Sequence, residues 1–276
     1  MRSNNCSLCD SPRLALLCVL LPFLVACSPS TRFNLAADAR GLVREQISAG
    51  NLPVIIYRDQ KISRSGEIHI YLDGDGKPWI GGKRIAVDPT TRSKLVLDMI
   101  AADEAPAILI GRPCYYIQVS ERPDSCSESL WTSHRYSPEV VSAISDAIAL
   151  QLKKYQPRKL VLIGYSGGGT LAALVASQLE SVDVLVTVAA NLNVDAWSEL
   201  HGYTPLARSL NEENFPYIPD AIKQFHFVGG ADRNVPPWIT GSVAGRQKSA
   251  RVIEKADFTH ECCWPKEWAS ALKELL

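Results

Sequence analysis

The sequence predicts an α/β fold in which helices cover both faces of a mainly parallel β-sheet. Two observations lead to this prediction. Short runs of apolar, β-branched residues recur along the chain, and segments with helical periodicity separate them. The strand runs are apolar throughout rather than alternating, which is typical of strands buried on both faces. With 46% hydrophobic and 21% charged residues, the composition is that of an ordinary globular protein.

The expected elements follow one another in a regular order. The first two strands are expected at 53–58 and 66–73, where an antiparallel pair is one possible arrangement. Further strands are expected at 106–113, 159–166, 182–190, 225–230 and 250–256. Helices are expected at 92–104, 137–155, 168–179 and 265–276, and the second begins with Ser and Pro, which suit a helix start.

One long connection interrupts this order. Residues 191–222 are rich in proline and aromatic side chains, which predicts an irregular excursion over the top of the sheet. Trp197 in this excursion and Trp238 after it suggest an apolar substrate pocket. No repeat or linker divides the rest of the chain, so residues 51–276 are expected to form one domain.

The amino-terminal segment has the features of an export signal. Residues 14–26 form an apolar run that follows Arg2 and Arg13. The run is shorter than the roughly 20 residues of a membrane-spanning helix and ends in small residues, as secretory signal peptides do. Residues 1–26 are therefore expected to be a signal peptide.

The end of that run, Leu24-Val25-Ala26-Cys27, resembles the lipobox of bacterial lipoproteins. The resemblance implies cleavage before Cys27, acylation of Cys27 and anchoring at the bacterial cell envelope, on the outer membrane or the periplasmic face. Residues 27–50 would then be a lipid-anchored tether that leads into a short helix. A soluble secreted protein cut nearby and an uncleaved anchor are the alternatives.

Cysteine use fits an exported protein. Four cysteines follow the expected anchor, and they allow three pairings. Cys114 and Cys126 flank a loop and are the favoured disulfide in an oxidising compartment. Cys262 and Cys263 could form a strained bond between neighbours or pair with the other two. Neither pair has the spacing of a zinc finger, so we expect no metal site and no cofactor.

The charge balance argues against one class of partner. Lys plus Arg and Asp plus Glu both number 29, so the chain has no basic excess. Nucleic-acid-binding proteins normally carry such an excess. We therefore expect no nucleic-acid partner, although a local basic patch is compatible with a neutral total.

The strongest chemical signal is a G-x-S-x-G motif at residues 164–168. It follows an apolar strand and precedes an Ala/Leu-rich helix, which is the setting of a nucleophile elbow with Ser166 as the nucleophile. In such a turn a side chain at Gly164 or Gly168 would collide with its neighbours. A phosphate-binding loop is the rival Gly-rich structure, but its G-x-x-x-x-G-K-[ST] pattern is absent.

A serine nucleophile needs a base, and the base needs a carboxylate to orient it. His260 follows the last expected strand near the carboxyl terminus, the position of the base in a Ser–Asp–His chain order. Asp232 follows the preceding strand and is the expected orienting carboxylate, with Asp195 as its rival. The remaining histidines are expected to be structural or to lie in loops, namely His69, His134, His201 and His226.

These segments, GYSGG, GGADRNVP and FTH, together with the strand order, resemble the α/β-hydrolase superfamily over roughly residues 50–276. The resemblance implies a mainly parallel eight-stranded sheet and acyl transfer through a serine. It also implies an oxyanion hole made by two backbone N–H groups. Gly167 is expected to supply one, and Asp75, in the loop 73–76, the other. This loop does not match the family's His-Gly-Gly letters, and it lacks the further ligands of a calcium loop.

The sequence thus predicts a serine hydrolase of ester, thioester or amide bonds at the bacterial cell envelope. Its partners would be a small-molecule or lipid acyl substrate and the membrane that holds Cys27. A non-catalytic binding or assembly module on a hydrolase scaffold is the alternative, because a fold alone does not carry activity.

Overall fold

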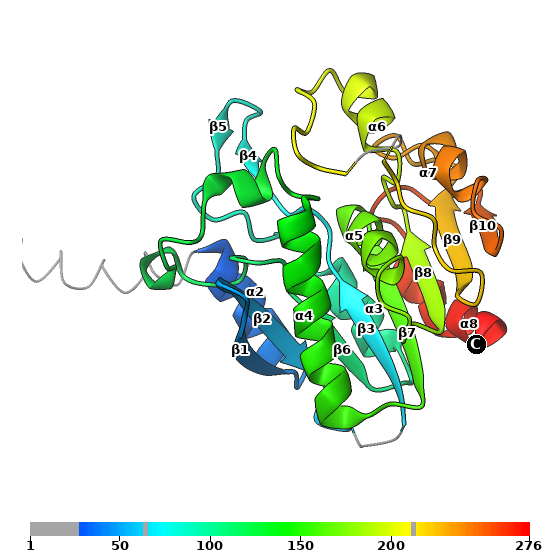
Figure 1. Cartoon of the computed structure of the whole chain (residues 1–276), viewed down its shortest axis with the longest axis horizontal. Helices are drawn as coiled ribbons and strands as arrows, with labels where there is room; N and C mark the ends of the chain where they lie inside the picture. Colours follow the sequence, from blue (N-terminus) through cyan, green and yellow to red (C-terminus); the bar gives the residue numbers. More distant parts are fainter. Residues whose placement is uncertain (1–27, 63–65, 211–213) are drawn as a thin grey trace, which may run out of the picture.

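The central element of the computed structural model, which describes residues 28–62, 66–210 and 214–276, is an eight-stranded sheet (Figure 1). Its strand order is β1-β2-β6-β3-β7-β8-β9-β10. The strands are β1 (Val43–Ala49), β2 (Leu52–Arg58), β3 (Glu67–Leu72), β6 (Ala107–Ile110), β7 (Lys159–Tyr165), β8 (Val184–Val188), β9 (Lys223–Gly229) and β10 (Ala250–Lys255).

The sheet is almost entirely parallel. From β6 to β10 along the sheet each neighbouring pair is parallel, and only β2 runs antiparallel to both of its neighbours, β1 and β6. Parallel neighbours need crossover connections, and helices supply them here. The carboxyl ends of the strands therefore meet at one edge, where ligand sites of open α/β sheets form.

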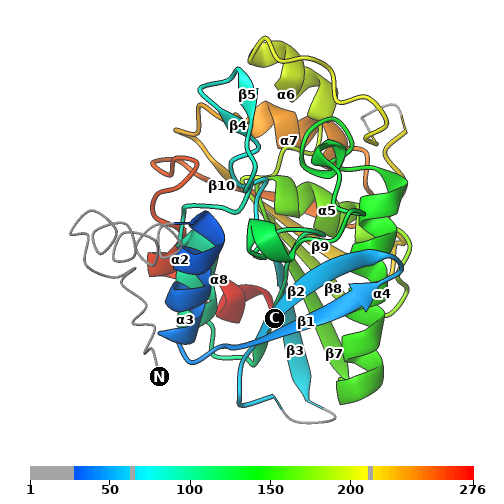
Figure 2. The same cartoon turned by 90° about the vertical axis from the view of Figure 1, so that its left-hand side faces the viewer.

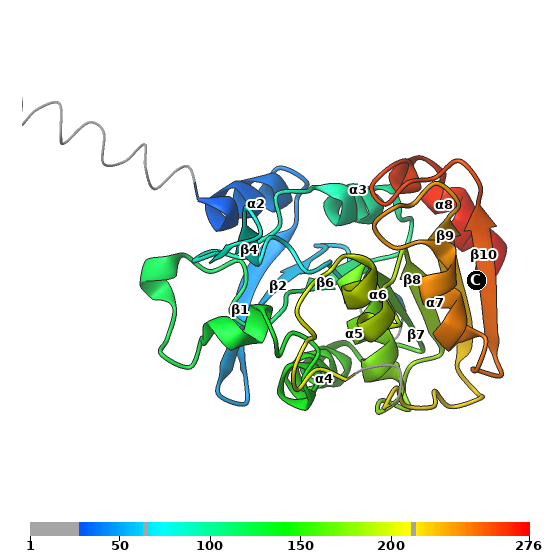
Figure 3. The same ribbon diagram turned by 90° about the horizontal axis from the view of Figure 1, so that it is seen from above.

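Helices cover both faces of the sheet. Figures 2 and 3 show α4 and α5 on one face and α2, α3 and α8 on the other. The helices are α2 (Pro29–Asp38), α3 (Leu95–Ala102), α4 (Pro138–Tyr155), α5 (Gly167–Ala176), α6 (Val194–Leu200), α7 (Pro237–Ala244) and α8 (Trp264–Leu275). Ser137 caps α4 by accepting a hydrogen bond from the N–H of Val140, and Pro138 occupies its first turn, as expected. Within the described residues, no helix is both long and apolar enough to cross a bilayer.

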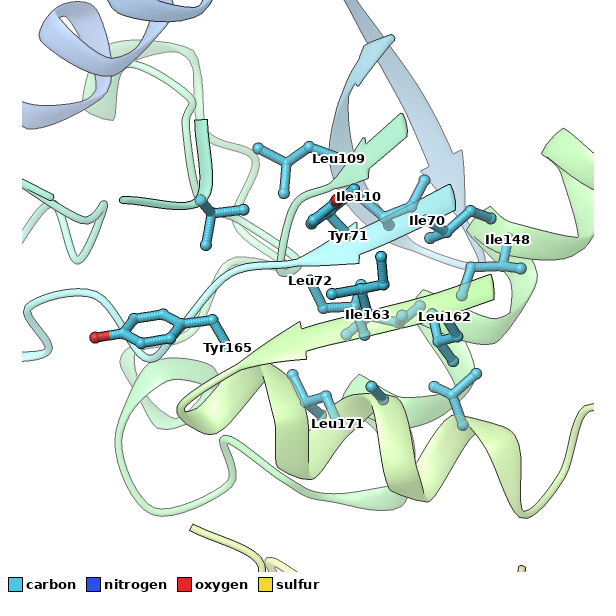
Figure 4. Packing of buried hydrophobic residues seen from close by; sticks show 14 of the residues in the cluster. Ile70, Tyr71, Leu72, Leu109, Ile110, Ile148, Leu162, Ile163, Tyr165 and Leu171 are labelled. Atoms are coloured by element: carbon cyan, nitrogen blue, oxygen red, sulfur yellow. The ribbon is translucent and has the colours of Figure 1, made fainter. Parts of the chain in front are cut away.

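The core lies between the sheet and its two helical layers. Figure 4 shows Leu162 and Ile163 of β7 packed among residues of β3, α4 and α5. Five of the six residues of β7 after its first are fully buried apolar or glycine positions, and the sixth, Tyr165, projects past the end of the strand. A continuous apolar strand thus holds the following turn, at residue 166, in a fixed position.

The structure changes three expectations. Strands β2 and β3 do not pair with each other, because β6 lies between them. The segment up to residue 50 contains a short helix, α2, as expected, but it also contributes a strand of the main sheet, β1, so the sheet begins ahead of residue 51. The excursion at 191–222 contains the short helix α6. The expected signal peptide and Cys27 lie outside the described residues.

Candidate active site

Ser166 lies at the turn between β7 and α5, with a positive backbone φ of 51°. This region is unfavourable for a residue with a side chain, and the glycines around it make the turn possible. A Cβ atom on Gly164 would lie 2.3 Å from the carbonyl oxygen of Gly168, and one on Gly168 would lie 2.2 Å from that of Leu72. The steric role expected for these two glycines is confirmed.

His260 and Asp232 lie next to this serine. The Nε2 atom of His260 is 3.0 Å from Ser166 Oγ, and its Nδ1 atom is 2.8 Å from Asp232 Oδ2. The three side chains come from the ends of β7 and β9 and from the loop between β10 and α8. The structure therefore brings together the three residues that the sequence selected, in hydrogen-bonding order.

Asp232 is held in place by the backbone that follows it. Its Oδ1 atom accepts hydrogen bonds from the N–H groups of Asn234 and Val235, both at 2.8 Å, while Oδ2 faces His260. The residue is only 3% exposed. Both carboxylate oxygens thus have partners, and the orientation toward His260 is fixed.

The loop that carries His260 is also fixed, through its backbone. The carbonyl oxygen of His260 accepts hydrogen bonds from the Tyr165 hydroxyl and from Trp264 Nε1, each at 3.1 Å. The Tyr165 ring also contacts the imidazole, with ring centroids 5.3 Å apart. Tyr165 directly precedes Ser166 in the chain. It therefore helps to position His260, the histidine that faces Ser166.

The loop after β3 lies against Ser166. A Cβ atom on Gly74 would lie 3.4 Å from Ser166 Cβ. The N–H of Gly74 donates to Asp73 Oδ1 at 2.7 Å, and the next residue of this loop is Asp75, whose N–H the sequence assigned to the oxyanion hole. Gly167 is the first residue of α5, and the N–H groups of a first helical turn have no acceptor within the helix.

The Asp75 carboxylate is turned into the protein. It contacts Arg112 Nη2 at 2.5 Å, Arg135 Nη1 at 3.0 Å and the Tyr136 hydroxyl at 2.7 Å. Burial alone would raise the pKa of Asp75, but the two guanidinium charges outweigh burial and lower it. The carboxylate therefore stays charged with two cations beside it, and Arg135 ties the loops 73–76 and 131–137 together.

A cavity of about 780 Å³ opens above these groups. Ser166 and His260 lie in its wall, together with Asp73, whose burial raises the pKa of its carboxyl group to about 6. Further lining side chains include Trp79, Trp197, Tyr203 and Leu206. Trp238, which the sequence also assigned to a pocket, is exposed on α7 and does not line this cavity.

The rival residues lie elsewhere. Asp195 is exposed in the first turn of α6, and the carboxylate bonded to His260 within the described chain is that of Asp232. The other histidines bond to different groups: His69 to Asp103 and Glu67, His134 to Ser133, His201 to the carbonyl of Asn234, and His226 to Thr187.

The cysteines form two disulfides. Cys114 and Cys126, the favoured pair, are joined with their Cα atoms 5.6 Å apart. Cys262 and Cys263 are joined to each other, which was one of the open alternatives, and Glu261 separates them from His260 in the chain. No group of three metal-ligating side chains occurs among the residues that the structure describes.

Four residues around the site were missed in the sequence. Arg112 and Tyr136 hold the Asp75 carboxylate, and Tyr165 and Trp264 hold the backbone of His260. Tyr136 had a visible signal, because it lies in a segment dense in polar and aromatic residues. Tyr165 lies within the G-x-S-x-G motif, but at a variable position of it, and Arg112 and Trp264 belong to no motif.

No family model and no curated protein matches the chain. Many solved structures share its fold. Est1E from Butyrivibrio proteoclasticus with bound ferulic acid aligns over 83% of this chain and 96% of its own, with a TM-score of 0.61 and 11% identity. The Pyrococcus furiosus esterase Pf2001 aligns over 86% and 91%, with a TM-score of 0.59 and 13% identity.

A third similar structure is a membrane phospholipase A described as a bacterial virulence factor, which aligns over 95% of this chain and 94% of its own. Its TM-score is 0.55 at 14% identity. Likeness at such low identity concerns the fold, and it agrees with the sheet order and the turn at Ser166. The chain therefore has the α/β-hydrolase fold.

Proposed function

We propose that this protein is a serine hydrolase that cleaves carboxylic ester bonds, or the related thioester and amide bonds, through an acyl-enzyme. The observation that carries this proposal is the continuous hydrogen-bonded arrangement Ser166–His260–Asp232, with distances of 3.0 and 2.8 Å. It lies in the wall of a cavity large enough for a substrate. The carboxyl edge of the sheet is where this fold places such groups.

The mechanism follows from the positions of the atoms. Ser166 Oγ attacks the substrate carbonyl carbon while His260 Nε2 takes the hydroxyl proton. Asp232 accepts a hydrogen bond from His260 Nδ1–H and stabilises the imidazolium that forms. The carbonyl oxygen, now negative, is received by the N–H groups of Gly167 and Asp75.

The acyl-enzyme then forms and breaks down. His260 returns its proton to the departing alcohol, thiol or amine as the bond to the carbonyl carbon breaks. A water molecule, deprotonated by the same imidazole, attacks the acyl-enzyme and releases the acid. The paired Arg112 and Arg135 offset the negative charge of Asp75, which would otherwise oppose the oxyanion.

Two features favour an amphiphilic acyl substrate. The cavity wall combines aromatic side chains with polar and charged groups, and the structures of similar fold include esterases and a phospholipase A. The lipobox-like end at Cys27 supports placement at a bacterial cell envelope, with the acylated cysteine as the anchor. Incorporation of labelled palmitate in a bacterial host tests the anchor: the Cys27→Ala variant should lose it, and equal labelling of both proteins would contradict it.

The catalytic proposal is tested with the Ser166→Ala variant. We expect kcat for short p-nitrophenyl esters to fall by about 10⁴-fold or more, because the nucleophile is lost. Ser270→Ala is the matched control, since Ser270 is an exposed serine on α8. Both variants should unfold like the unchanged protein.

Covalent labelling with a fluorophosphonate probe separates this proposal from a non-catalytic binding module. The unchanged protein and Ser270→Ala should be labelled, with the adduct at Ser166, and Ser166→Ala should not. Folded protein that takes up no probe and cleaves no ester would favour the binding module.

A further inference from the structure

A small hairpin projects from the body of the protein at the mouth of the cavity. It consists of β4 (Trp79–Ile80) and β5 (Arg84–Ile85), an antiparallel pair outside the main sheet. Figures 1 and 2 both show it extending away from the central sheet. Residues 77–87, here called the rim hairpin, contribute several groups to the cavity wall, among them Lys77, Trp79 and Gly81.

The base of the rim hairpin is firmly attached to the body. The N–H of Lys77 donates to the carbonyl of Pro89 at 2.8 Å, and within the hairpin the N–H of Ala86 donates to the carbonyl of Pro78 at 2.8 Å, which joins its two arms. Trp131 Nε1 donates to the carbonyl of Ala86 at 3.1 Å. These bonds fix the direction in which the hairpin leaves the body.

The tip of the rim hairpin, by contrast, stands clear of the protein. Gly81 and Gly82 have φ values of +61° and +70°, and a Cβ atom on either would meet nothing within 4 Å. The hairpin therefore turns tightly in open space.

The exposed side chains of the rim hairpin are of two kinds. Trp79, Ile80 and Val87 are 38, 39 and 58% exposed, which leaves apolar surface of this segment in water. Lys77, Lys83 and Arg84 are exposed too, and the segment 77–87 contains no acidic residue. None of the three cations forms an ion pair with the described part of the chain. In a chain with no net charge, this is a local basic and aromatic patch.

A bilayer with anionic lipids fits both kinds of side chain. Tryptophan favours the interface between headgroups and acyl chains, and lysine and arginine are attracted to the negative surface. Each such cation contributes to binding only near the surface, so a projecting, rigid hairpin is an effective way to present them.

The start of the described chain lies beside the base of the rim hairpin. The N–H of Ser30, in the first turn of α2, donates to Asp88 Oδ2 at 2.9 Å. Asp88 follows Val87 directly, and its carboxylate is also paired with Arg122. The segment that precedes residue 28 is therefore attached beside the rim hairpin, and an anchor in that segment would hold the hairpin and the cavity mouth close to the membrane.

We propose that the rim hairpin docks onto an anionic lipid bilayer, with Trp79 and Ile80 at the interface and Lys77, Lys83 and Arg84 on the headgroups. Docking places the cavity mouth against the membrane surface, from which an acyl substrate can enter. The surface contact does not depend on hydrolysis: the Ser166→Ala variant should dock as the unchanged protein does.

Hydrogen exchange resolved along the chain tests this directly. The full chain is incubated with vesicles of phosphatidylcholine alone or of phosphatidylcholine mixed with phosphatidylglycerol. We expect the amides of residues 77–87 to exchange more slowly on the anionic vesicles than on the neutral ones. Because the readout is confined to this segment, binding by other parts of the chain does not produce it.

Matched charge reversals separate a specific patch from general attraction. Lys83→Glu/Arg84→Glu should weaken docking by at least about thirtyfold, from about 1 kcal/mol per cation near the surface. Lys153→Glu/Lys223→Glu changes the total charge equally, but at exposed positions toward the opposite edge of the sheet, and should leave docking unchanged.

Three results would overturn the proposal: no slowing of exchange at residues 77–87 on anionic vesicles, equal slowing on neutral vesicles, or equal loss in both charge-reversal variants. Failure of docking with ester hydrolysis intact would refute the membrane contact and leave the proposed function standing. Docking without ester hydrolysis would refute the proposed function and leave the membrane contact standing.

Discussion

At the scale of single residues, the site depends on one strained backbone and two fixed side chains. Ser166 adopts a positive φ that the fully buried strand before it and the glycines around it impose. Asp232 is fixed by two backbone N–H groups, so it can orient His260 without moving. The backbone conformation of Ser166 and the orientation of Asp232 are set by residues nearby in the chain. The contact of both residues with His260 joins distant parts of the chain.

The orientation of His260 by Asp232 can be tested by Asp232→Asn. The amide would offer an N–H or a neutral oxygen to Nδ1, so it would stabilise neither the required tautomer nor the imidazolium. We expect kcat for ester hydrolysis to fall by about 10³- to 10⁴-fold with little change in KM. Steady-state kinetics measures both values.

Asp195→Asn is the matched control, because Asp195 is the exposed carboxylate that the sequence offered as the rival of Asp232. It should retain nearly full activity. A loss confined to Asp195→Asn, or a loss of the same size in both variants, would contradict the assignment.

The residues of the site differ in how far the sequence could predict them. Ser166 was predictable because its motif, strand and helix are contiguous. Asp232 and His260 were predictable from chain order. The group around Asp75 was not, because Arg112 and Arg135 lie 37 and 60 positions away in the chain, and no local pattern records that their side chains meet.

At the scale of elements, the amino-terminal strand β1 shows why part of the fold was missed. The sequence of β1 alternates between half-buried and exposed side chains, as an edge strand does. The prediction relied on continuous apolar runs, which identify central strands. β1 lies at the edge of the sheet, and so its polar character was mistaken for that of a tether.

The α2 helix should contribute to stability as a part of the core. Phe33 is buried, and its ring contacts Tyr57 and Tyr116 with centroids 5.4 and 4.5 Å apart. Phe33→Ala should lower the free energy of unfolding by about 3–4 kcal/mol, from lost burial and the cavity left behind. Urea denaturation measures this change.

Leu35 on the same helix is the control, since it is exposed to solvent. Leu35→Ala should change the free energy of unfolding by less than about 0.5 kcal/mol. If Phe33→Ala were as mild as Leu35→Ala, α2 would be a tether after all, only loosely associated with the sheet.

At the scale of the whole molecule, the carboxyl edge of the sheet carries the site, and the sheet interior holds polar groups that catalysis does not use. His226 is one of them. It lies fully buried on β9, where Nδ1 is 2.8 Å from Thr187 Oγ1 and Nε2 has no partner among the described residues. Burial lowers the pKa of His226 to about 4.

This pKa makes the stability of the molecule depend on pH. In the unfolded chain His226 titrates near 6.5. Between pH 6.5 and 4, His226 is protonated in the unfolded state but stays neutral in the folded state. The free energy of unfolding therefore decreases as the pH falls from 6.5 toward 4. At one pKa unit per 1.4 kcal/mol, the loss amounts to about 3 kcal/mol at pH 4.

His226→Gln removes this titration while it keeps a polar partner for Thr187. Urea unfolding of both proteins at a series of pH values between 7 and 4 gives the comparison. The variant should lose about 3 kcal/mol less than the unchanged protein over that range, whatever its stability at pH 7. All other titrating groups are common to both proteins and cancel in the difference. If the free energies of unfolding of the two proteins changed with pH in parallel, His226 would accept a proton as easily in the folded sheet as in water. That result would contradict the effect expected from its burial.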